Sequence, residues 1–351
     1  MNFSALLKAV ESGLMPDFVI RAGIRRLLAR RLVEQQLAAG SDPARPRTQF
    51  IESMTAAPIA PVPDKANEQH YELPAEFFEQ VLGRHLKYSG CYFKNAADSL
   101  DDAEAAMLRL TAERAEIKDG QEILELGCGW GSLTLWIAEH FPGCRITAVS
   151  NSAPQREFIS ARCSERSLTN VEILTADMND FETARRFDRV VSVEMFEHMR
   201  NWPALLDRIG NWLHPDGRLF VHVFCHREFA YEFETKGEDD WMGRHFFTAG
   251  IMPAADLLPA VARGFSVSQQ WQVPGMHYAR TAEAWLKNLD ARRRDVLPIL
   301  ARAYGEANAR LWLQRWRIFF MACAELFGYD DGTEWFVAHY LLRRRSGASN
   351  D

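Results

Sequence analysis

Three titratable residues gather within five positions of this chain: Glu194, Glu197 and His198. They directly follow an apolar run at residues 189–193, which predicts a buried strand. Acids and bases clustered beyond a strand indicate proton transfer more than core packing, although a lone histidine is more often structural. We therefore predict that this group is catalytic, with a histidine base whose pKa is tuned by a neighbouring carboxylate.

A glycine-rich turn is the second feature that could form part of a functional site. Residues 122–133 combine an apolar strand, a turn and the start of a helix, and Gly127, Gly129 and Gly131 alternate within the turn. These glycines let the backbone approach a ligand closely. The turn alone could serve NAD, FAD or S-adenosylmethionine, or only connect a strand to a helix. The G-x-G-x-G spacing and the acid Glu125, placed to bind a ligand's ammonium group, favour S-adenosylmethionine.

Other predicted strand ends supply further cofactor-binding candidates. Asn151 stands where dinucleotide-binding proteins place an acid for the ribose hydroxyls, so an NAD site is disfavoured. Asn151 or Gln155 could hold those hydroxyls by hydrogen bonds instead. Asp177 could accept the adenine amino group and Met178 could contact the ring, although Asp177 is equally compatible with a helix cap.

The aromatic-rich segment 69–93 precedes this core. It could be a buried aromatic cluster, or it could be a lid over the ligand. As a lid, it would bring the hydroxyls of Tyr88 and Ser89 to polar atoms of the cofactor.

Strand and helix patterns alternate from residue 121 onward. The predicted strands are 123–126, 145–150, 171–175, 189–193 and 218–224, with helices at 133–141, 155–164 and 202–213 and a turn at 214–217. This succession predicts an α/β fold with a parallel sheet, covered on both faces, that binds ligands at the carboxyl ends of its strands. A strand at 265–273, a helical block at 282–327 and a last strand at 335–342 follow, and we expect the block to roof the pocket.

The N-terminal residues 1–40 predict helices with a break at 13–16. Apolar residues recur at helical spacing in the second helix, and its other face carries arginines: Arg21, Arg25, Arg26, Arg30 and Arg31. Such a helix could lie on an anionic membrane. The acidic overall charge favours docking on the protein itself or on a second subunit, so a homodimer stays open. Residues 40–63, with five prolines, predict a linker or irregular arm.

Composition narrows the function classes. The 351 residues are 47% hydrophobic, which is ample for a packed core, and the net charge of -6 disfavours nucleic acid as a partner. Six widely spaced cysteines without C-x-x-C motifs indicate reduced thiols in a cytoplasmic protein with no metal site. No apolar run approaches the roughly 18 residues of a membrane span, and no secretory leader is recognisable.

Taken in order, the motifs resemble the coclaurine N-methyltransferase branch of the cyclopropane fatty acid synthase superfamily. The resemblance covers residues 15–342 through His70-Tyr71-Glu72-Leu73-Pro74, Lys87-Tyr88-Ser89, residues 124–131, residues 194–198, Asp239-Asp240-Trp241 and residues 322–329. It implies a class I methyltransferase fold, which is Rossmann-like with a mostly parallel seven-stranded sheet, and S-adenosylmethionine as the methyl donor. It also implies that Glu197 and His198 match the family's catalytic Glu-His pair, with Glu194 helping to line the site.

The resemblance implies a domain organisation as well. Residues 1–92 would form an N-terminal helical region and lid, and residues 93–345 the methyltransferase domain with a helical cap at about 276–328, followed by a tail at 346–351.

Two chemistries occur in this superfamily. Its cyclopropane synthases are understood to hold a bicarbonate base through a cysteine after the Tyr-Ser pair, the Phe-Glu-His glutamate, a histidine after the fifth strand and a late tyrosine. Here Gly90 follows Tyr88-Ser89 and Phe319 aligns with the tyrosine, while Glu197 and His222 remain. Cys91, one residue late, could replace the missing thiol.

The incomplete anion site favours methylation of a small amine, aromatic or cyclic, over cyclopropanation of unsaturated phospholipid acyl chains. A non-catalytic S-adenosylmethionine-binding scaffold is a third hypothesis, and the acid-base cluster at residues 194–198 argues against it.

Overall fold

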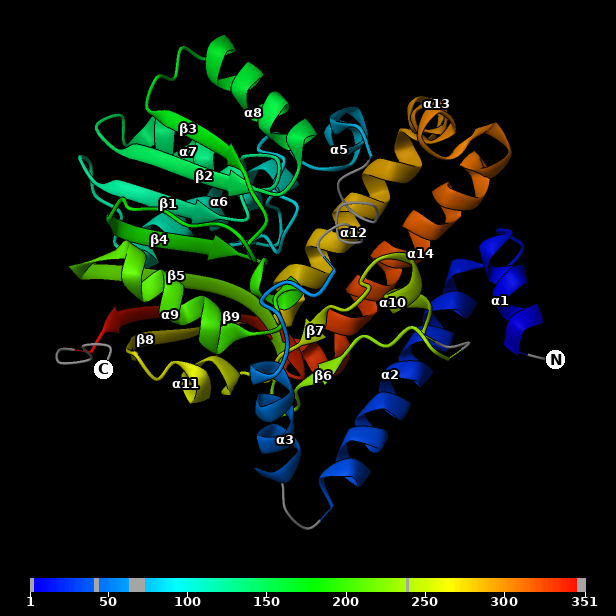
Figure 1. The fold of residues 1–351 in the computed structure, drawn as a ribbon. Coiled ribbons are helices and arrows are strands. Elements are labelled where there is room, and N and C mark those ends of the chain that lie inside the picture. The colour runs from blue at the N-terminus through cyan, green and yellow to red at the C-terminus, as the bar shows by residue number, and fades with distance from the viewer. Residues whose placement is uncertain (1–2, 41–43, 63–72, 238–239, 346–351) are drawn as a thin grey trace.

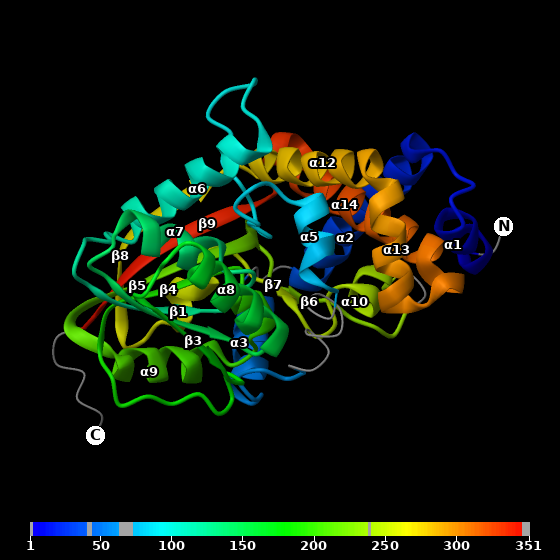
Figure 2. The same cartoon turned by 90° about the horizontal axis from the view of Figure 1, so that it is seen from above.

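The computed structural model describes residues 3–40, 44–62, 73–237 and 240–345 (Figure 1). Within these ranges an α/β sheet domain adjoins a body of helices, and the two are seen side by side in two perpendicular views (Figures 1 and 2). The predicted tail at 346–351, the His70-Tyr71-Glu72 part of one motif and Asp239 of another lie outside the described residues.

Seven strands form the main sheet in the order β3-β2-β1-β4-β5-β9-β8. The strands are β1 (Glu122–Leu126), β2 (Arg145–Ser150), β3 (Val171–Thr175), β4 (Phe187–Val193), β5 (Leu213–His226), β8 (Phe265–Val273) and β9 (Trp335–Arg344). The first five in the sheet order pair in parallel, whereas β9 is antiparallel to both β5 and β8. The predicted α/β class with a mostly parallel seven-stranded sheet is confirmed.

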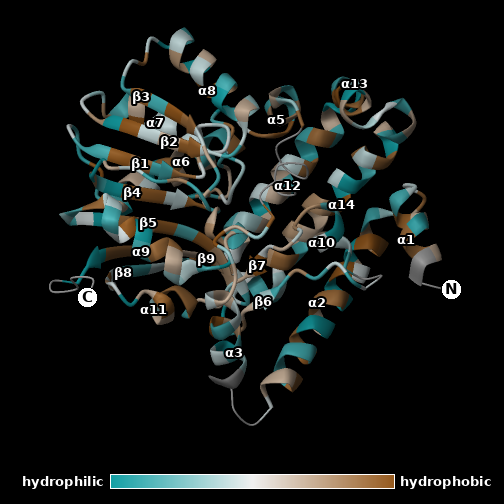
Figure 3. Ribbon diagram, in the orientation of Figure 1, coloured by the Kyte–Doolittle hydropathy of each residue, from teal (hydrophilic) through white to brown (hydrophobic). Residues whose placement is uncertain are grey.

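Helices cover both faces of this sheet. They are α6 (Leu100–Arg114), α7 (Ser132–His140), α8 (Ala153–Glu165), α9 (Trp202–Trp212) and α11 (Leu257–Val261). Successive strand residues point to opposite faces, so Ile123 packs in the cluster with α6 and α7 while Leu124 packs in the cluster with α9 and α11. Both faces are therefore apolar, and the central strands are largely hydrophobic in Figure 3.

The helical body is built from α1 (Phe3–Glu11), α2 (Asp17–Ala39), α5 (Ala75–Val81), α12 (Gly275–Ala291), α13 (Arg293–Tyr304) and α14 (Ala309–Phe327). The chain forms α12 to α14 between β8 and β9, as the predicted late insertion requires. The described residues also form short elements: β6 (Tyr231–Glu232), α10 (Trp241–His245), β7 (Ile251–Met252) and single turns of 3₁₀-helix at Phe196–His198, Glu306–Asn308 and Tyr329–Gly332.

Helix α2 docks on the protein itself through part of its basic face. Arg21 forms ion pairs with Glu283 and Glu325, and Arg25 pairs with Glu325, so α2 is tied to α12 and α14. None of the helices in the described part of the chain combines the length and apolar character of a membrane-spanning segment. Membrane contact, a homodimer and a cytoplasmic location stay predictions.

The prediction of an irregular arm at residues 40–63 is wrong for much of its length. Helix α3 spans Ala44–Thr55, because Phe50, Ile51 and Met54 recur at helical spacing and pack on the cluster around α9. Pro46 lies in the first turn of the helix, where backbone N–H groups have no intrahelical partner to lose.

The turn predicted at residues 214–217 lies inside β5, which begins at Leu213. Leu213 pairs with Phe187 and pairing then resumes between Arg218 and Arg189, so the four turn-forming residues are out of register with β4. The turn composition therefore produces an irregularity in a strand rather than a break before it.

Candidate active site

A cavity opens at the carboxyl ends of β1, β2, β3 and β4, beside the segment that precedes α6. Nine predicted cofactor-binding residues line it: Tyr88, Ser89, Glu125, Gly127, Gly129, Asn151, Gln155, Asp177 and Met178. Parallel strands end at one edge of a sheet, which is why residues far apart in sequence converge here. The tenth predicted residue, Gly131, does not line the cavity.

The three glycines of the turn have different surroundings, although all adopt positive φ. A Cβ atom on Gly127 would lie 2.6 Å from Met195, and one on Gly131 would lie 2.7 Å from Ile159. A Cβ atom on Gly129 would meet no atom within 4 Å. Gly127 and Gly131 therefore permit close packing, while Gly129 leaves open space for a ligand beside the backbone.

The cavity wall carries polar atoms suited to a polar, cationic ligand. The carboxyl group of Glu125 is buried and accepts a hydrogen bond from Thr134 Oγ1 at 2.5 Å, and burial raises its pKa to about 7. Four buried polar atoms of lining residues have no protein partner: Thr111 Oγ1, Trp130 Nε1, Ser132 Oγ and Gln155 Nε2. Such unpaired groups are costly unless a ligand or water binds them, so the residues present fit the ribose and amino acid parts of S-adenosylmethionine.

Gly129→Ala is expected to weaken binding of S-adenosylhomocysteine by about tenfold or more, because the methyl group enters the ligand space of a turn with φ +54°. Gly120→Ala is the matched control, since Gly120 also has positive φ and open surroundings but lies outside the cavity lining. Titration calorimetry would measure both affinities. Equal affinities in the two variants would show that Gly129 does not border the ligand.

The segment 86–89 forms one wall of the cavity and includes Lys87, which was part of a predicted motif but was not predicted as a site residue. Lys87 is buried, donates to Ser89 Oγ and, at 2.8 Å, to the carbonyl oxygen of Gly90. Burial lowers the pKa of Lys87, and the nearby carboxylates of Glu104 and Glu194 oppose that effect. Lys87 thus fixes the turn that carries Tyr88 and Ser89.

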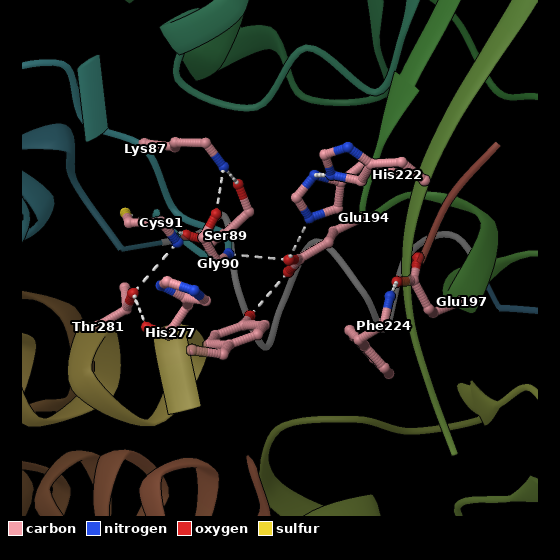
Figure 4. Close-up of polar contacts among 12 residues, drawn as sticks. Lys87, Ser89, Gly90, Cys91, Glu194, Glu197, His222, Phe224, His277 and Thr281 are labelled. Carbon is pink, nitrogen blue, oxygen red and sulfur yellow. Dashed lines mark hydrogen bonds and ion pairs between the residues drawn. The ribbon is translucent and has the colours of Figure 1, made fainter. Parts of the chain in front are cut away.

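Glu194 is the centre of a hydrogen-bond network in the candidate site (Figure 4). Its Oε1 accepts from Gly90 N at 2.9 Å and from His222 Nε2 at 3.1 Å, and its Oε2 accepts from the Tyr278 hydroxyl at 2.7 Å. Its own backbone has φ +48°, an uncommon conformation for a side-chain-bearing residue. Burial raises the pKa of Glu194, but the donors and Lys87 favour the ionised form.

Glu197 and His198 have different positions in this site. Glu197 is fully buried outside the cavity lining, and its Oε1 accepts from Phe224 N at 2.7 Å while Oε2 has no partner. Burial, together with the charge of Glu194, raises the pKa of Glu197 well above its usual value. His198 lines the cavity with its ring 4.6 Å from that of Phe247, and burial lowers its pKa to about 4.

The electrostatics therefore separate the roles of the three groups. Two coupled carboxyl groups do not both ionise readily, and the partner with more hydrogen-bond donors keeps the charge more easily. Glu194, with its three donors, therefore keeps the carboxylate form more easily than Glu197, which favours the protonated form. His198 is a neutral imidazole at physiological pH and can accept a proton or a hydrogen bond.

Phe319, which was aligned with the family's late tyrosine, does not contact the Glu194 network. Phe319 stacks on Phe246 within the helical body, with ring centroids 4.4 Å apart, and Tyr278 on α12 instead contacts Glu194. Cys91 does not replace the missing thiol, because its sulfur points away from Glu194 in Figure 4 and lies 3.6 Å from Ser89 O. Tyr278 lies in the helices inserted between β8 and β9, and the spacing of residues in the sequence does not show which residue of such an insertion reaches the site.

His222, which the resemblance named only as a remaining anion ligand, belongs to the network around Glu194, and the sequence contained a second signal for it. It is the polar residue in the otherwise apolar run Leu219–Val223 of a central strand, and it is fully buried. A buried histidine in such a strand requires hydrogen-bond partners, which here are Glu194 and His339. The described residues contain no group of three or more His, Cys, Asp or Glu side chains placed to hold a metal ion.

Comparison with known proteins shows the family to which this chain belongs. Residues 62–333 match the family model described as mycolic acid cyclopropane synthetase. The chain is 40% identical to (S)-coclaurine N-methyltransferase of Thalictrum flavum subsp. glaucum, over 97% of this chain and 95% of that one. It is also 27% identical to the cyclopropane-fatty-acyl-phospholipid synthase of Escherichia coli (strain K12), over 91% of this chain and 76% of that one.

A solved structure agrees with these sequence matches. The chain superposes on a crystal structure of coclaurine N-methyltransferase bound to N-methylheliamine and SAH, with a TM-score of 0.93 and 40% identity, over 97% of this chain and 99% of that one. SAH is the product that S-adenosylmethionine leaves after methyl transfer.

Proposed function

Because this chain belongs to the mycolic acid cyclopropane synthetase family and is an S-adenosylmethionine-dependent methyltransferase, we propose that it methylates the nitrogen of a small aromatic or cyclic amine. The names of the N-methyltransferase relatives support an amine acceptor, in particular an alkaloid-like amine. Within the site, the observation that carries the proposal is the carboxyl group of Glu194, which three hydrogen-bond donors hold beside the cavity.

Glu194 also distinguishes amine methylation from cyclopropanation. In the cyclopropane synthases that the sequence resembles, a histidine after the fifth strand and a late tyrosine hold bicarbonate. Here His222 and Tyr278 both donate to the carboxylate of Glu194. An external anion would have to displace a carboxylate of the chain that already has these donors, so a bicarbonate-dependent reaction is disfavoured.

We assign the cofactor contacts as follows. Glu125 would face the ammonium group of S-adenosylmethionine, Asn151 and Gln155 the ribose hydroxyls, and Asp177 with Met178 the adenine. One oxygen of Asp177 accepts from Asn179 N at 2.8 Å, which fixes the orientation of its carboxylate. The bound cofactor supplies an electrophilic methyl carbon, which the nitrogen lone pair takes up as the carbon–sulfur bond breaks.

The residues of this chain orient the acceptor and hold its proton. A protonated amine is attracted to Glu194 and must lose a proton before its lone pair can react. We propose that His198, neutral and on the cavity wall, accepts that proton, while Glu194 stabilises the positive charge on nitrogen. Glu197, behind the cavity wall, would donate or accept a hydrogen bond through its unpaired Oε2. That Glu197 and His198 work as a pair stays a prediction.

The acceptor class can be tested with methyl-labelled S-adenosylmethionine. The protein is incubated with a panel of secondary aromatic and cyclic amines and, separately, with vesicles of unsaturated phospholipid. Label is expected in amine products only. Label confined to lipid would overturn the proposed function in favour of cyclopropanation, and label in neither would favour the scaffold hypothesis.

A further inference from the structure

A line of hydrogen-bonded side chains leads from Glu194 across the sheet to α6. His222 Nε2 lies 3.1 Å from Glu194 Oε1, His222 Nδ1 lies 2.9 Å from His339 Nε2, and His339 Nδ1 lies 2.9 Å from a terminal guanidinium nitrogen of Arg114. Both histidines are fully buried. We call Arg114, His339 and His222 the imidazole chain.

The sheet register places the imidazole chain. His222 on β5 and His339 on β9 are direct partners in the antiparallel ladder, and Trp271 on β8 is the next partner of His339. Arg114, the last residue of α6, lies over the Trp271 ring with its guanidinium carbon 4.9 Å from the ring centroid. This cation–π contact holds the guanidinium beside the paired residues His222, His339 and Trp271.

The direction of every hydrogen bond in the imidazole chain follows from Arg114. A guanidinium can only donate, so His339 Nδ1 must be the acceptor and its Nε2 must carry the proton. His339 Nε2 then donates to His222 Nδ1, and His222 Nε2–H donates to Glu194 Oε1. Both imidazoles are therefore neutral Nε2–H tautomers, and all their N–H groups point toward the carboxylate.

We propose that Arg114 and His339 are positioning residues that act through His222, fixing its Nε2–H tautomer so that it always donates to Glu194. The inference rests on the proposed function of Glu194 in amine methylation. Because the imidazole chain ends at a guanidinium that cannot accept a proton, it orients the carboxylate rather than carrying protons out of the site.

Other groups also act on Glu194. The titratable groups that interact with it are Lys87 and Cys91 from the segment before α6, Glu197 and His198 from the turn after β4, His222 from β5, Tyr278 from α12 and Cys323 from α14, although the Cys91 sulfur points away from it. Burial lowers the pKa of His222 and of His339 well below the usual range, which keeps both neutral. Removing the donor on His222 therefore removes one specific stabilisation of the carboxylate and leaves the other groups in place.

The tautomers can be observed without substrate. In protein labelled with ¹⁵N-histidine, long-range ¹H–¹⁵N spectra should show His222 and His339 with protonated Nε2 and bare Nδ1, unchanged between pH 6 and 8. The signal that disappears from the spectrum of the His339→Gln variant is assigned to His339. A protonated Nδ1 on either residue, or titration of either near pH 6.5, would overturn the proposal.

The kinetic test compares four variants of the full chain. His339→Phe replaces the imidazole with another aromatic ring and removes the hydrogen bonds to Arg114 and His222. It should lower kcat about tenfold, the scale of one charge-assisted hydrogen bond. It should also move the acidic limb of the kcat profile to higher pH, because a carboxylate that loses a donor is protonated more easily. His339→Gln retains a donor and an acceptor and should restore most of the activity.

Arg114→Met tests whether Arg114 fixes the tautomer of His339. Arg114 is half-buried at the end of α6, so this change leaves the hydrophobic core intact. It should broaden the His339 signal pattern to two tautomers and shift the acidic limb in the same direction, while Arg109→Met on the exposed face of α6 should change neither.

An unchanged acidic limb and kcat in both His339→Phe and Arg114→Met, in protein that methylates amines, would overturn the positioning role. Absence of amine methylation by the wild type, with the predicted tautomers present, would instead count against the proposed function alone.

Discussion

Glu194→Gln is expected to lower kcat for amine methylation about 100- to 1,000-fold, the range seen when a preorganised charge at a reacting centre is removed. Glutamine keeps the shape, so its oxygen can still accept from Gly90 N and His222 Nε2, and the Tyr278 hydroxyl can rotate to accept from the new amide. What is lost is the negative charge that stabilises a developing cation on the acceptor nitrogen. Single-turnover kinetics with labelled donor would measure the chemical step.

The control for this change is Glu157→Gln on the exposed face of α8, which removes the same charge away from the cavity. Its kcat should equal that of the wild type. Because glutamine does not titrate, the deficit of Glu194→Gln should persist at high pH. A deficit that disappears above pH 8 would contradict a role for the carboxylate charge and indicate only a folding or binding defect.

His198→Ala is expected to lower kcat at neutral pH about 100-fold, within the usual range for loss of a general base, while the affinity for S-adenosylhomocysteine stays within about threefold. The imidazole is neutral throughout the working range, since burial lowers its pKa to about 4, so its protonation state does not change there. The ratio of wild-type to variant kcat should therefore stay constant between pH 6 and 8. Stopped assays at saturating amine across that range would show this.

His214→Ala is the matched control, because His214 lies in the irregular start of β5, outside the cavity lining. It should leave kcat unchanged. If His198→Ala instead lost donor affinity and kept kcat, His198 would belong to the cofactor site and the base would have to be sought elsewhere.

Much of the fold followed from local patterns. The strands at 145–150, 171–175 and 265–273 are identical to β2, β3 and β8, because alternating or continuous apolar runs between turn residues have few other stable arrangements. Helix α3 was missed because proline count outweighed the helical spacing of its apolar residues. Proline in a first turn does not prevent a helix, and this position effect is not visible in composition.

The site residues also fall into those that could be predicted from local sequence and those that could not. Residues adjoining a strand end, such as Asn151, Asp177 and Glu194, were predictable because the topology of a parallel sheet brings such ends together. The cluster at residues 194–198 was predicted as one catalytic group, yet its members have different surroundings. Glu194 faces three donors, whereas Glu197 has one donor and a buried unpaired oxygen, so only their surroundings distinguish carboxylate from protonated acid.

Local sequence was enough to predict the sheet, the glycine turn and the position of the acid-base cluster, since each depends on residues close together along the chain. The cofactor class followed from the order of motifs along most of the chain. The side chains that hold Glu194 were visible only in the folded structure. Tyr278 comes from an inserted helix, and His222 meets His339 through an antiparallel pairing of strands more than a hundred residues apart. Such contacts depend on register and helix packing, which no local pattern encodes.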